Sequence, residues 1–410
     1  MRQLRLRKLR ASSKVLISLS VVIFVYTVAT SIMQYKLALF VDELTPSYTF
    51  FGLIMGLPWL FSLLTDMPTG AFAERFGKKR TVTLGLFGLA LSGFILSAVS
   101  NVFNLFWVLV LFGIFEGFLT VAGMASIIAA SPRLKENRFV GGYLSASSFG
   151  YAVGPLLAGA VVAWFGGQTP FLIFACICFG AGVFSIFAIP ADSKKTEVFF
   201  TALRNVVIKD RIYKAELKEF FSVGRIAVFI GAFMLVSGMW SEFIWAMEPI
   251  LIKEAGKSAL WGGVILSAFV VPFALLDYPV GRWIDRKQKR FLSIFFGLFA
   301  CGAGVIAFSF AHSPVLMLSA AAGTSVGFAF FYVAANGIFD SFSTYHARGL
   351  MTGVWQSAED IGFVIGPILG GLLADIWGLR AAFMFFGFIF LVLMLAVLKE
   401  KQLIVGYELR

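Results

Sequence analysis

The chain has 410 residues, of which 59% are hydrophobic and only 14% are charged. A soluble chain would carry about 25% charged residues, so this composition excludes an ordinary soluble protein and indicates membrane-spanning segments. The net charge of +12 does not predict a nucleic-acid partner, because the cations lie between the apolar runs, where they orient a protein in a membrane.

Continuous apolar runs follow one another along the chain, and each is long enough to cross a bilayer as a helix. Because the runs do not alternate with polar residues, they do not predict strands. We therefore expect an all-α integral membrane protein with twelve transmembrane helices in two bundles of six. The predicted spans are 15–41, 49–72, 81–99, 104–130, 139–165, 170–189, 226–251, 258–283, 291–310, 314–340, 348–374 and 379–398.

One long polar connection separates six spans from six spans. Between Val198 and Lys214 it alternates apolar with charged residues, which is typical of an amphipathic helix on a membrane surface. The predicted parts are a basic tail (1–14), a first bundle (15–189), this linker (190–225), a second bundle (226–398) and a second tail (399–410).

The distribution of basic residues predicts the orientation. If the N-terminus lies inside, only Lys36, Lys253, Lys257 and Arg380, among 34 Lys and Arg residues, fall at outer ends or loops. Such a bias predicts that both termini are cytoplasmic in a cell membrane.

A short motif occurs once in each half of the chain. The motif begins with an acid at the end of an apolar run and has a glycine four residues later. An acid–arginine pair comes next, and several cations follow it. The corresponding residues lie 211 positions apart, which indicates a duplicated membrane protein. We interpret the motif as a gate rather than only an orientation signal. Its residues are Asp66, Gly70, Glu74 and Arg75, and in the second copy Asp277, Gly281, Asp285 and Arg286.

The fifth span of each half carries a second repeated pattern. Small residues four positions apart let helix backbones approach closely, and a proline removes a backbone donor and permits a bend. These helix-bending residues are Gly150, Gly154, Pro155 and Gly159, matched by Gly366, Pro367 and Gly371 in the second half.

Together these motifs resemble the major facilitator superfamily over essentially the whole chain. The Gly150–Gly159 pattern is similar to one found in the drug:proton antiporter branch. The resemblance implies two six-helix bundles that work by alternating access around a central cavity lined by spans one, four, seven and ten. Many such exporters have an arginine in the fourth span where this chain has Gly113, so a role for the nearby Glu116 must be argued from its own chemistry.

Acids within the spans are the candidate proton or cation sites, because an ionisable group in a bilayer core costs roughly 2.5–3.5 kcal/mol. Glu116 lies near the middle of the fourth span and is the first candidate; the alternative is a structural carboxyl group bonded to a neighbouring helix. Glu242 lies between Trp240 and Trp245, where charge and cation–π contact suit a cationic aromatic ligand. The alternative is an acid that forms an outer-gate ion pair or faces water. Glu248 is assigned to the outer gate.

Glu359 and Asp360 are adjacent in the eleventh span, and no more than one of them is expected to face a cavity. Polar side chains in the first and tenth spans are candidate ligand contacts, although such groups also join helices. They are Tyr26, Gln34, Tyr35, Tyr332 and Asn336.

No cofactor, metal site or enzyme activity is predicted. The two histidines lie in predicted loops, and Cys176, Cys178 and Cys301 lie in apolar runs as small fillers. Buried acids with almost no buried cation favour a lipophilic, cationic small molecule as the partner, together with protons, in a monomeric carrier. The sequence thus predicts proton-coupled efflux of the multidrug type; the alternatives are a lipid or lysolipid flippase and a proton-coupled importer of a small nutrient.

Overall fold

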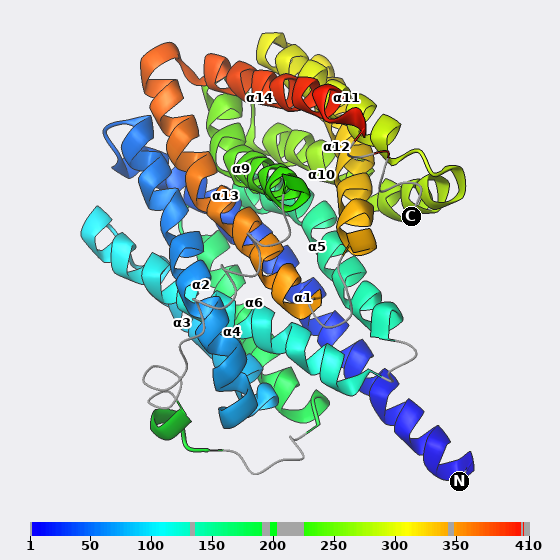
Figure 1. Cartoon of the computed structure of the whole chain (residues 1–410). Helices are drawn as coiled ribbons and strands as arrows, with labels where there is room; N and C mark the ends of the chain where they lie inside the picture. The colour runs from blue at the N-terminus through cyan, green and yellow to red at the C-terminus, as the bar shows by residue number, and fades with distance from the viewer. Residues whose placement is uncertain are drawn as a thin grey trace. The chain divides into compact units, whose positions relative to one another are not determined.

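The computed structural model describes the backbone of residues 2–131, 136–190, 197–202, 225–342, 348–402 and 405. In this part of the chain the structure contains twelve long helices and no strand (Figure 1). Each helix corresponds to one of the twelve predicted spans, although several helix ends differ from the predicted limits, so the all-α prediction is confirmed. Most of the amphipathic segment expected between Val198 and Lys214 lies outside the described residues.

The helices of the first half are α1 (Arg2–Leu44), α2 (Tyr48–Phe76), α3 (Lys78–Leu96), α4 (Val102–Ala130), α5 (Glu136–Phe165) and α6 (Thr169–Ala188). Those of the second half are α9 (Arg225–Glu254), α10 (Ala259–Lys287), α11 (Arg290–Phe310), α12 (Pro314–Phe342), α13 (Arg348–Trp377) and α14 (Leu379–Lys399). Eleven of them contain, within the described residues, a stretch long and apolar enough to cross a membrane. The chain is a multi-pass membrane protein.

The repeated motif is helical in both halves. Asp66, Gly70 and Arg75 all belong to α2, and the chain turns only at Gly77, whose φ of 112° suits a residue without a Cβ atom. In the second copy, α10 continues through Arg286 and ends at Gln288, which has a left-handed φ of 49°. The motif therefore occupies the last turns of a helix, and the reversal of direction follows it.

The chain divides into two compact units. Unit 1 comprises Met1–Lys36 and Leu57–Arg211, and unit 2 comprises Leu37–Gly56 and Ile212–Arg410. The division at 211/212 falls inside the predicted linker. The sequence did not indicate that residues 37–56 group with the second unit.

Polar contacts hold residues 37–56 within unit 2. The carboxylate of Asp375 on α13 accepts hydrogen bonds from the backbone N–H groups of Tyr48 (2.9 Å) and Thr49 (2.8 Å). Those N–H groups belong to the first turn of α2 and have no partner within that helix. Lys253 on α9 also lies 2.8 Å from Asp42. An acid from another helix thus caps α2, in the position where the helix dipole favours negative charge.

The repeated glycines lie where helices touch. A Cβ atom on Gly150 of α5 would lie 2.8 Å from the carbonyl oxygen of Phe24 on α1, and one on Gly154 would meet the Ser31 side chain. In unit 2, α13 packs along α9 (Figure 1), and a Cβ atom on Gly366 would meet the backbone of Met239. Small residues therefore let the fifth helix of each half approach the first, as the sequence pattern predicts.

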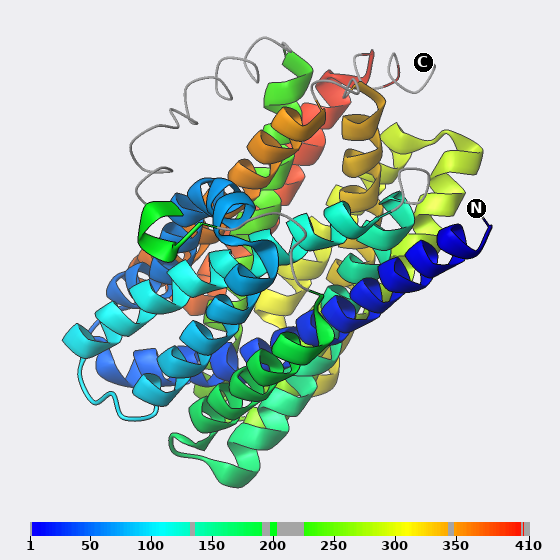
Figure 2. The same ribbon diagram turned by 90° about the horizontal axis from the view of Figure 1, so that it is seen from below.

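The described start of the linker packs against α2 within unit 1. Phe199 lies edge-on to Phe72 and Phe76 of α2, with ring centroids 5.4 and 5.7 Å apart, and Ala202 is fully buried against the same cluster. Figure 2 shows this short helical turn beside the end of α2. The N–H of Glu197 also donates to the carbonyl oxygen of Arg75 (2.8 Å), so the linker begins attached to the motif helix.

Candidate functional site

In unit 1, a serine hydroxyl lies between a buried acid and a half-buried acid. Ser62 and Asp66 are one turn apart on α2, and Glu116 is on α4. The Ser62 Oγ atom is 2.7 Å from Glu116 Oε2 and 3.3 Å from Asp66 Oδ1. Glu116 is only 6% exposed, and Ser62 is equally buried. The structure therefore connects the acid of the motif with the acid of the fourth span.

A bound proton would satisfy both contacts of this cluster. A serine hydroxyl has a single hydrogen to donate, whereas an ionised carboxylate only accepts. Ser62 can donate to one carboxylate, and its contact with the other is a hydrogen bond only if that carboxyl group is protonated and donates to Oγ. If both acids were ionised, two negative charges would lie beside one hydroxyl in a site largely removed from water. The cluster is best satisfied when it holds one proton.

Glycines on α4 create the space for this cluster. A Cβ atom on Gly117 would lie 2.6 Å from Asp66 Oδ1 and 3.0 Å from Thr65 Oγ1, and one on Gly113 would meet the carbonyl oxygen of Pro58. Any side chain at these positions would push α4 away from α2. The glycine found where related exporters carry an arginine thus permits close helix packing at the site.

Two tyrosines lie within electrostatic range of the cluster. Tyr26 of α1 and Tyr143 of α5 are both buried, and both phenol groups interact with the charge of Glu116. Tyr26, a predicted ligand contact, is therefore associated with the acid site. Side chains from α1, α2, α4 and α5 contribute to the surroundings of Glu116.

Unit 2 contains a related but weaker arrangement. Tyr332 Oη of α12 donates to Glu359 Oε1 of α13 over 3.4 Å, and Asp277 of α10 interacts electrostatically with the same phenol. The amide of Asn336 donates to the carbonyl oxygen of Tyr332 (3.0 Å), as expected for a polar group bonded along its own helix. The motif acid of each half thus lies near a second acid, with a hydroxyl group between or beside them.

The remaining candidates include Trp240, whose surroundings in unit 2 are aromatic. The ring of Trp240 packs among Phe243, Phe269 and Phe390, all within 6.0 Å between centroids, in the interior of unit 2. Trp245, Glu242 and Asp360 have further interactions, and the first two are buried. Trp240 is therefore a core residue in this structure. In unit 1, Gln34 and Tyr35 of α1 are buried as well.

Glu248 is the most completely buried acid among the described residues. Its side chain is 0% exposed, and neither carboxyl oxygen has a hydrogen-bond partner in the part of the chain that the structure describes. The sequence assigned it to an outer gate. An unpartnered carboxylate in such a place carries a large desolvation cost, so Glu248 is a second candidate for protonation.

The charged residues of the first motif connect to the linker and to α6. Arg75 lies 3.5 Å from Glu197, a partner outside the motif that the sequence did not indicate. Lys79 donates to the carbonyl oxygen of Ile186 (2.6 Å) at the end of α6. In the second copy Asp285 and Arg286 are exposed. Their roles as gate residues remain predictions.

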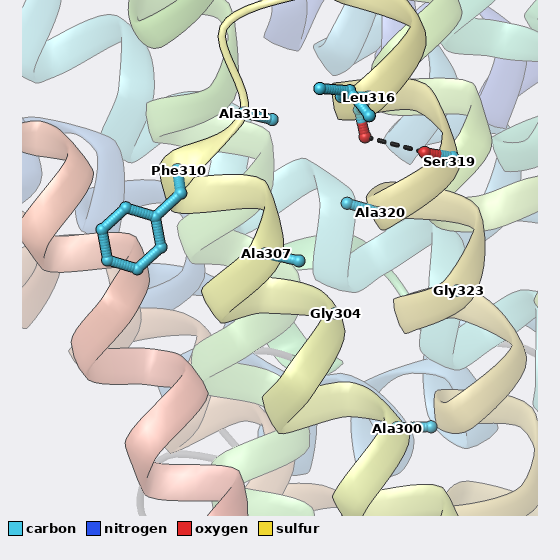
Figure 3. Close-up of a pocket in the computed structure, with 9 residues that line it drawn as sticks. All are labelled: Ala300, Gly304, Ala307, Phe310, Ala311, Leu316, Ser319, Ala320 and Gly323. Atoms are coloured by element: carbon cyan, nitrogen blue, oxygen red, sulfur yellow. Dashed lines mark hydrogen bonds between the residues drawn. The ribbon is translucent and has the colours of Figure 1, made fainter.

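A groove between α11 and α12 is a cavity of a different kind. It measures about 510 Å³ and is lined mainly by small apolar residues (Figure 3). Ser319, its polar side chain, donates to the carbonyl oxygen of Leu316 (3.0 Å), as drawn in Figure 3. The lining contains no ionisable group, so the groove is not a candidate for proton or cation binding.

Comparison with known proteins settles the family. The sequence profile of the Major Facilitator Superfamily matches residues 17–256 and 228–402. The chain belongs to this superfamily. The profile covers both halves, in agreement with the duplicated motifs, and the protein is therefore a transporter of the superfamily type, as the resemblance implied.

The relatives are distant. An uncharacterized MFS-type transporter of Methanocaldococcus jannaschii is 22% identical over 361 residues, which cover 85% of this chain and 88% of the relative. Multidrug resistance protein 2 of Bacillus subtilis (strain 168) is 24% identical over 345 residues, with 80% and 81% covered. A bacterial homologue of the human lysosomal transporter Spinster, solved in an inward-facing and occupied conformation, matches with a TM-score of 0.77 at 13% identity, over 95% of this chain and 97% of that one.

The sequence predicted roles for Glu116 and Asp66 but not for the residue between them. The signal was present, because Ser62 precedes Asp66 by four positions and so shares its helix face. Serine in a membrane span most often bonds to its own helix, and nothing in the sequence distinguishes Ser62 from such residues. Glu197 was also missed, because it lies in the polar linker, outside the predicted spans and the repeated motif.

Proposed function

We propose that this transporter exports lipophilic, cationic compounds in exchange for protons, and that the Glu116–Ser62–Asp66 cluster carries the proton. The supporting observation is the hydroxyl group of Ser62, which lies 2.7 Å from the buried carboxyl group of Glu116 and 3.3 Å from the half-buried one of Asp66. With one proton bound, the cluster has a net charge of −1 and every polar contact is satisfied. Without it, two uncompensated charges lie in a poorly hydrated site.

The exchange follows from this charge balance. A cationic substrate that approaches the cluster stabilises the doubly ionised form, and this favours release of the proton. Conversely, a proton that binds the cluster removes the charge that attracts the cation. Each ligand therefore lowers the affinity for the other, and such reciprocal coupling is the thermodynamic requirement for antiport.

The repeated motif can couple the charge of the cluster to a conformational change of α2. Asp66 belongs to both the acid cluster and the gate motif of α2, and Arg75, nine residues further, is held by Glu197. A change in the charge of Asp66 therefore acts on the same helix that carries these contacts. In alternating access, the site is exposed to one side of the membrane at a time, and a helix with two sets of contacts provides the bistable element.

The relatives support the substrate class. One relative is named as a multidrug resistance protein, and few cations are buried in the described spans of this chain. The assignment to the cell membrane, the cytoplasmic termini and the monomeric state remain part of this proposal.

Proteoliposomes test the proposal directly. The purified protein is reconstituted with a pH gradient, and an ethidium-like cation is added outside or inside. Dissipation of the pH gradient that depends on the cation supports proton exchange. A protein that moves labelled phospholipid but is indifferent to the cation is a flippase, and inward accumulation of a polar solute with protons identifies an importer; either result contradicts the proposal.

A further inference from the structure

The C-terminal end of α10 carries a groove that is distinct from the acid sites. It is a hollow of about 360 Å³, within the range of about 300–1,000 Å³ typical of ligand pockets. Its lining comes from a single helix and combines aromatic and basic side chains. The lining residues are Tyr278, Pro279, Arg282, Trp283, Arg286 and Lys287.

Helical spacing explains why these residues form one surface. Tyr278, Arg282 and Arg286 are four positions apart, and so are Pro279, Trp283 and Lys287, so the two rows are neighbours on one face of α10. The opposite side, with Val280 and Ile284, is buried against unit 2. The groove is therefore the outward face of a membrane-spanning helix.

The aromatic side chains are held in place but remain accessible. The guanidinium group of Arg282 lies 5.6 Å from the centroid of the Tyr278 ring, in cation–π contact. Trp283 packs edge-on against Phe330 of α12 at 5.9 Å, yet 40% of it is exposed, and Tyr278 is 72% exposed. Exposed Tyr and Trp at the end of a span are typical of the level of lipid headgroups.

Within the described residues, the three cations of the groove have no acidic partner. Arg282, Arg286 and Lys287 are exposed, and no carboxylate in the described ranges forms an ion pair with any of them. Asp277, whose charge acts on Tyr332, and Asp285 lie on the neighbouring row of α10. The groove thus presents three donors of positive charge above an apolar, aromatic floor.

We propose that this groove binds the headgroup of an anionic phospholipid. Its phosphate would be held by the two arginines and the lysine, and its glycerol and upper acyl chains would lie over Tyr278, Pro279 and Trp283. The basic pattern of the sequence predicts that this end of α10 faces the inner leaflet, where anionic lipids attract basic side chains with roughly 1 kcal/mol per cation. The fork of an arginine matches a phosphate through two hydrogen bonds.

Lipid retention measured by native mass spectrometry tests the site. Protein is released from micelles that contain equal amounts of phosphatidylglycerol and phosphatidylcholine. Wild-type protein should retain phosphatidylglycerol preferentially. The double variant Arg282→Gln/Arg286→Gln should lose this retention by tenfold or more, whereas Arg282→Lys/Arg286→Lys, which keeps the charge but not the fork geometry, should retain an intermediate amount.

A matched control separates a site from general attraction. Lys289→Gln/Lys399→Gln removes the same charge from two exposed residues of unit 2 that do not line the groove. It should retain phosphatidylglycerol as wild type does. Equal loss in both double variants, no loss in either, or displacement of the lipid by millimolar inorganic phosphate would each overturn the proposal. Thermal unfolding of each variant establishes that it is folded, and all replaced residues are exposed.

Discussion

The hydroxyl of Ser62 lies 2.7 Å from Oε2 of Glu116, although the residues are 54 positions apart and lie on different helices. The same hydroxyl is 3.3 Å from Asp66. This contact converts two separate sequence features, a repeated motif and an isolated acid in a span, into one cluster. We expect substitutions of its three members to have distinct effects on transport.

Replacement of Glu116 by glutamine should uncouple transport from protons. The amide would keep the size of the side chain and accept the hydrogen bond from Ser62, but it cannot exchange a proton. We expect normal insertion and a loss of substrate-driven proton release of about 100-fold or more, the lower end of the range for removal of a proton-transfer group. Glu400→Gln, at the end of α14, is the control and should behave as wild type. Wild-type proton release by Glu116→Gln would rule out this acid as the carrier.

The variant Ser62→Ala should separate the two acids without removing either. A hydrogen bond to a charged group contributes about 1.5–3 kcal/mol, so transport should fall by roughly tenfold or more. Ser62→Thr keeps the hydroxyl and should retain most activity. A structural effect alone would leave the pH profile of transport unchanged in Ser62→Ala, and we expect that profile to shift. Equal activity of the alanine and threonine variants would contradict the role of the hydroxyl.

The replacement of Asp66 by asparagine should abolish transport while leaving insertion intact. Asp66 is part of both the acid cluster and the gate motif, so neutralising it removes one partner of Ser62 and the negative end of the motif. Substrate flux in proteoliposomes measures transport, and the amount of protein in isolated membranes measures insertion. Wild-type transport by Asp66→Asn would contradict both the gate and the relay.

Gly150→Ala should destabilise the protein, whereas Gly141→Ala, in the same helix, should not. A Cβ atom at Gly150 would lie 2.8 Å from the carbonyl oxygen of Phe24, whereas one at Gly141 meets nothing within 4 Å. Overpacking costs about 1–3 kcal/mol, and alanine in an open helical site gains up to about 1 kcal/mol over glycine. Thermal unfolding in detergent compares them, and a less stable Gly141→Ala than Gly150→Ala would refute the packing argument.

Asp375→Asn should loosen the start of α2. The carboxylate accepts from the N–H groups of Tyr48 and Thr49, and the loss of such a cap costs about 1 kcal/mol, less where water screens the charge. Hydrogen exchange of those two amides should become faster by up to about fivefold. Glu43→Gln, an exposed neighbour in the same segment, is the control. Unchanged exchange in Asp375→Asn would show that water replaces the cap without cost.

The sequence by itself determined the number and approximate positions of the helices. The physical reason is that a bilayer requires about twenty apolar residues per span, whatever the neighbouring helices are. The sequence also identified the repeated motifs, the close glycine contacts of the fifth spans and Glu116, an acid whose position within a span is energetically costly.

Only the tertiary structure decided which side chains meet. Ser62 joins Glu116 to Asp66, Arg75 meets Glu197, and Trp240 is enclosed by phenylalanines, because the rotation and spacing of each helix are fixed by neighbours far away in the chain. All faces of a membrane span are similarly apolar in sequence. Packing determines which face carries the chemistry, since a hydrogen bond requires partners within about 3 Å.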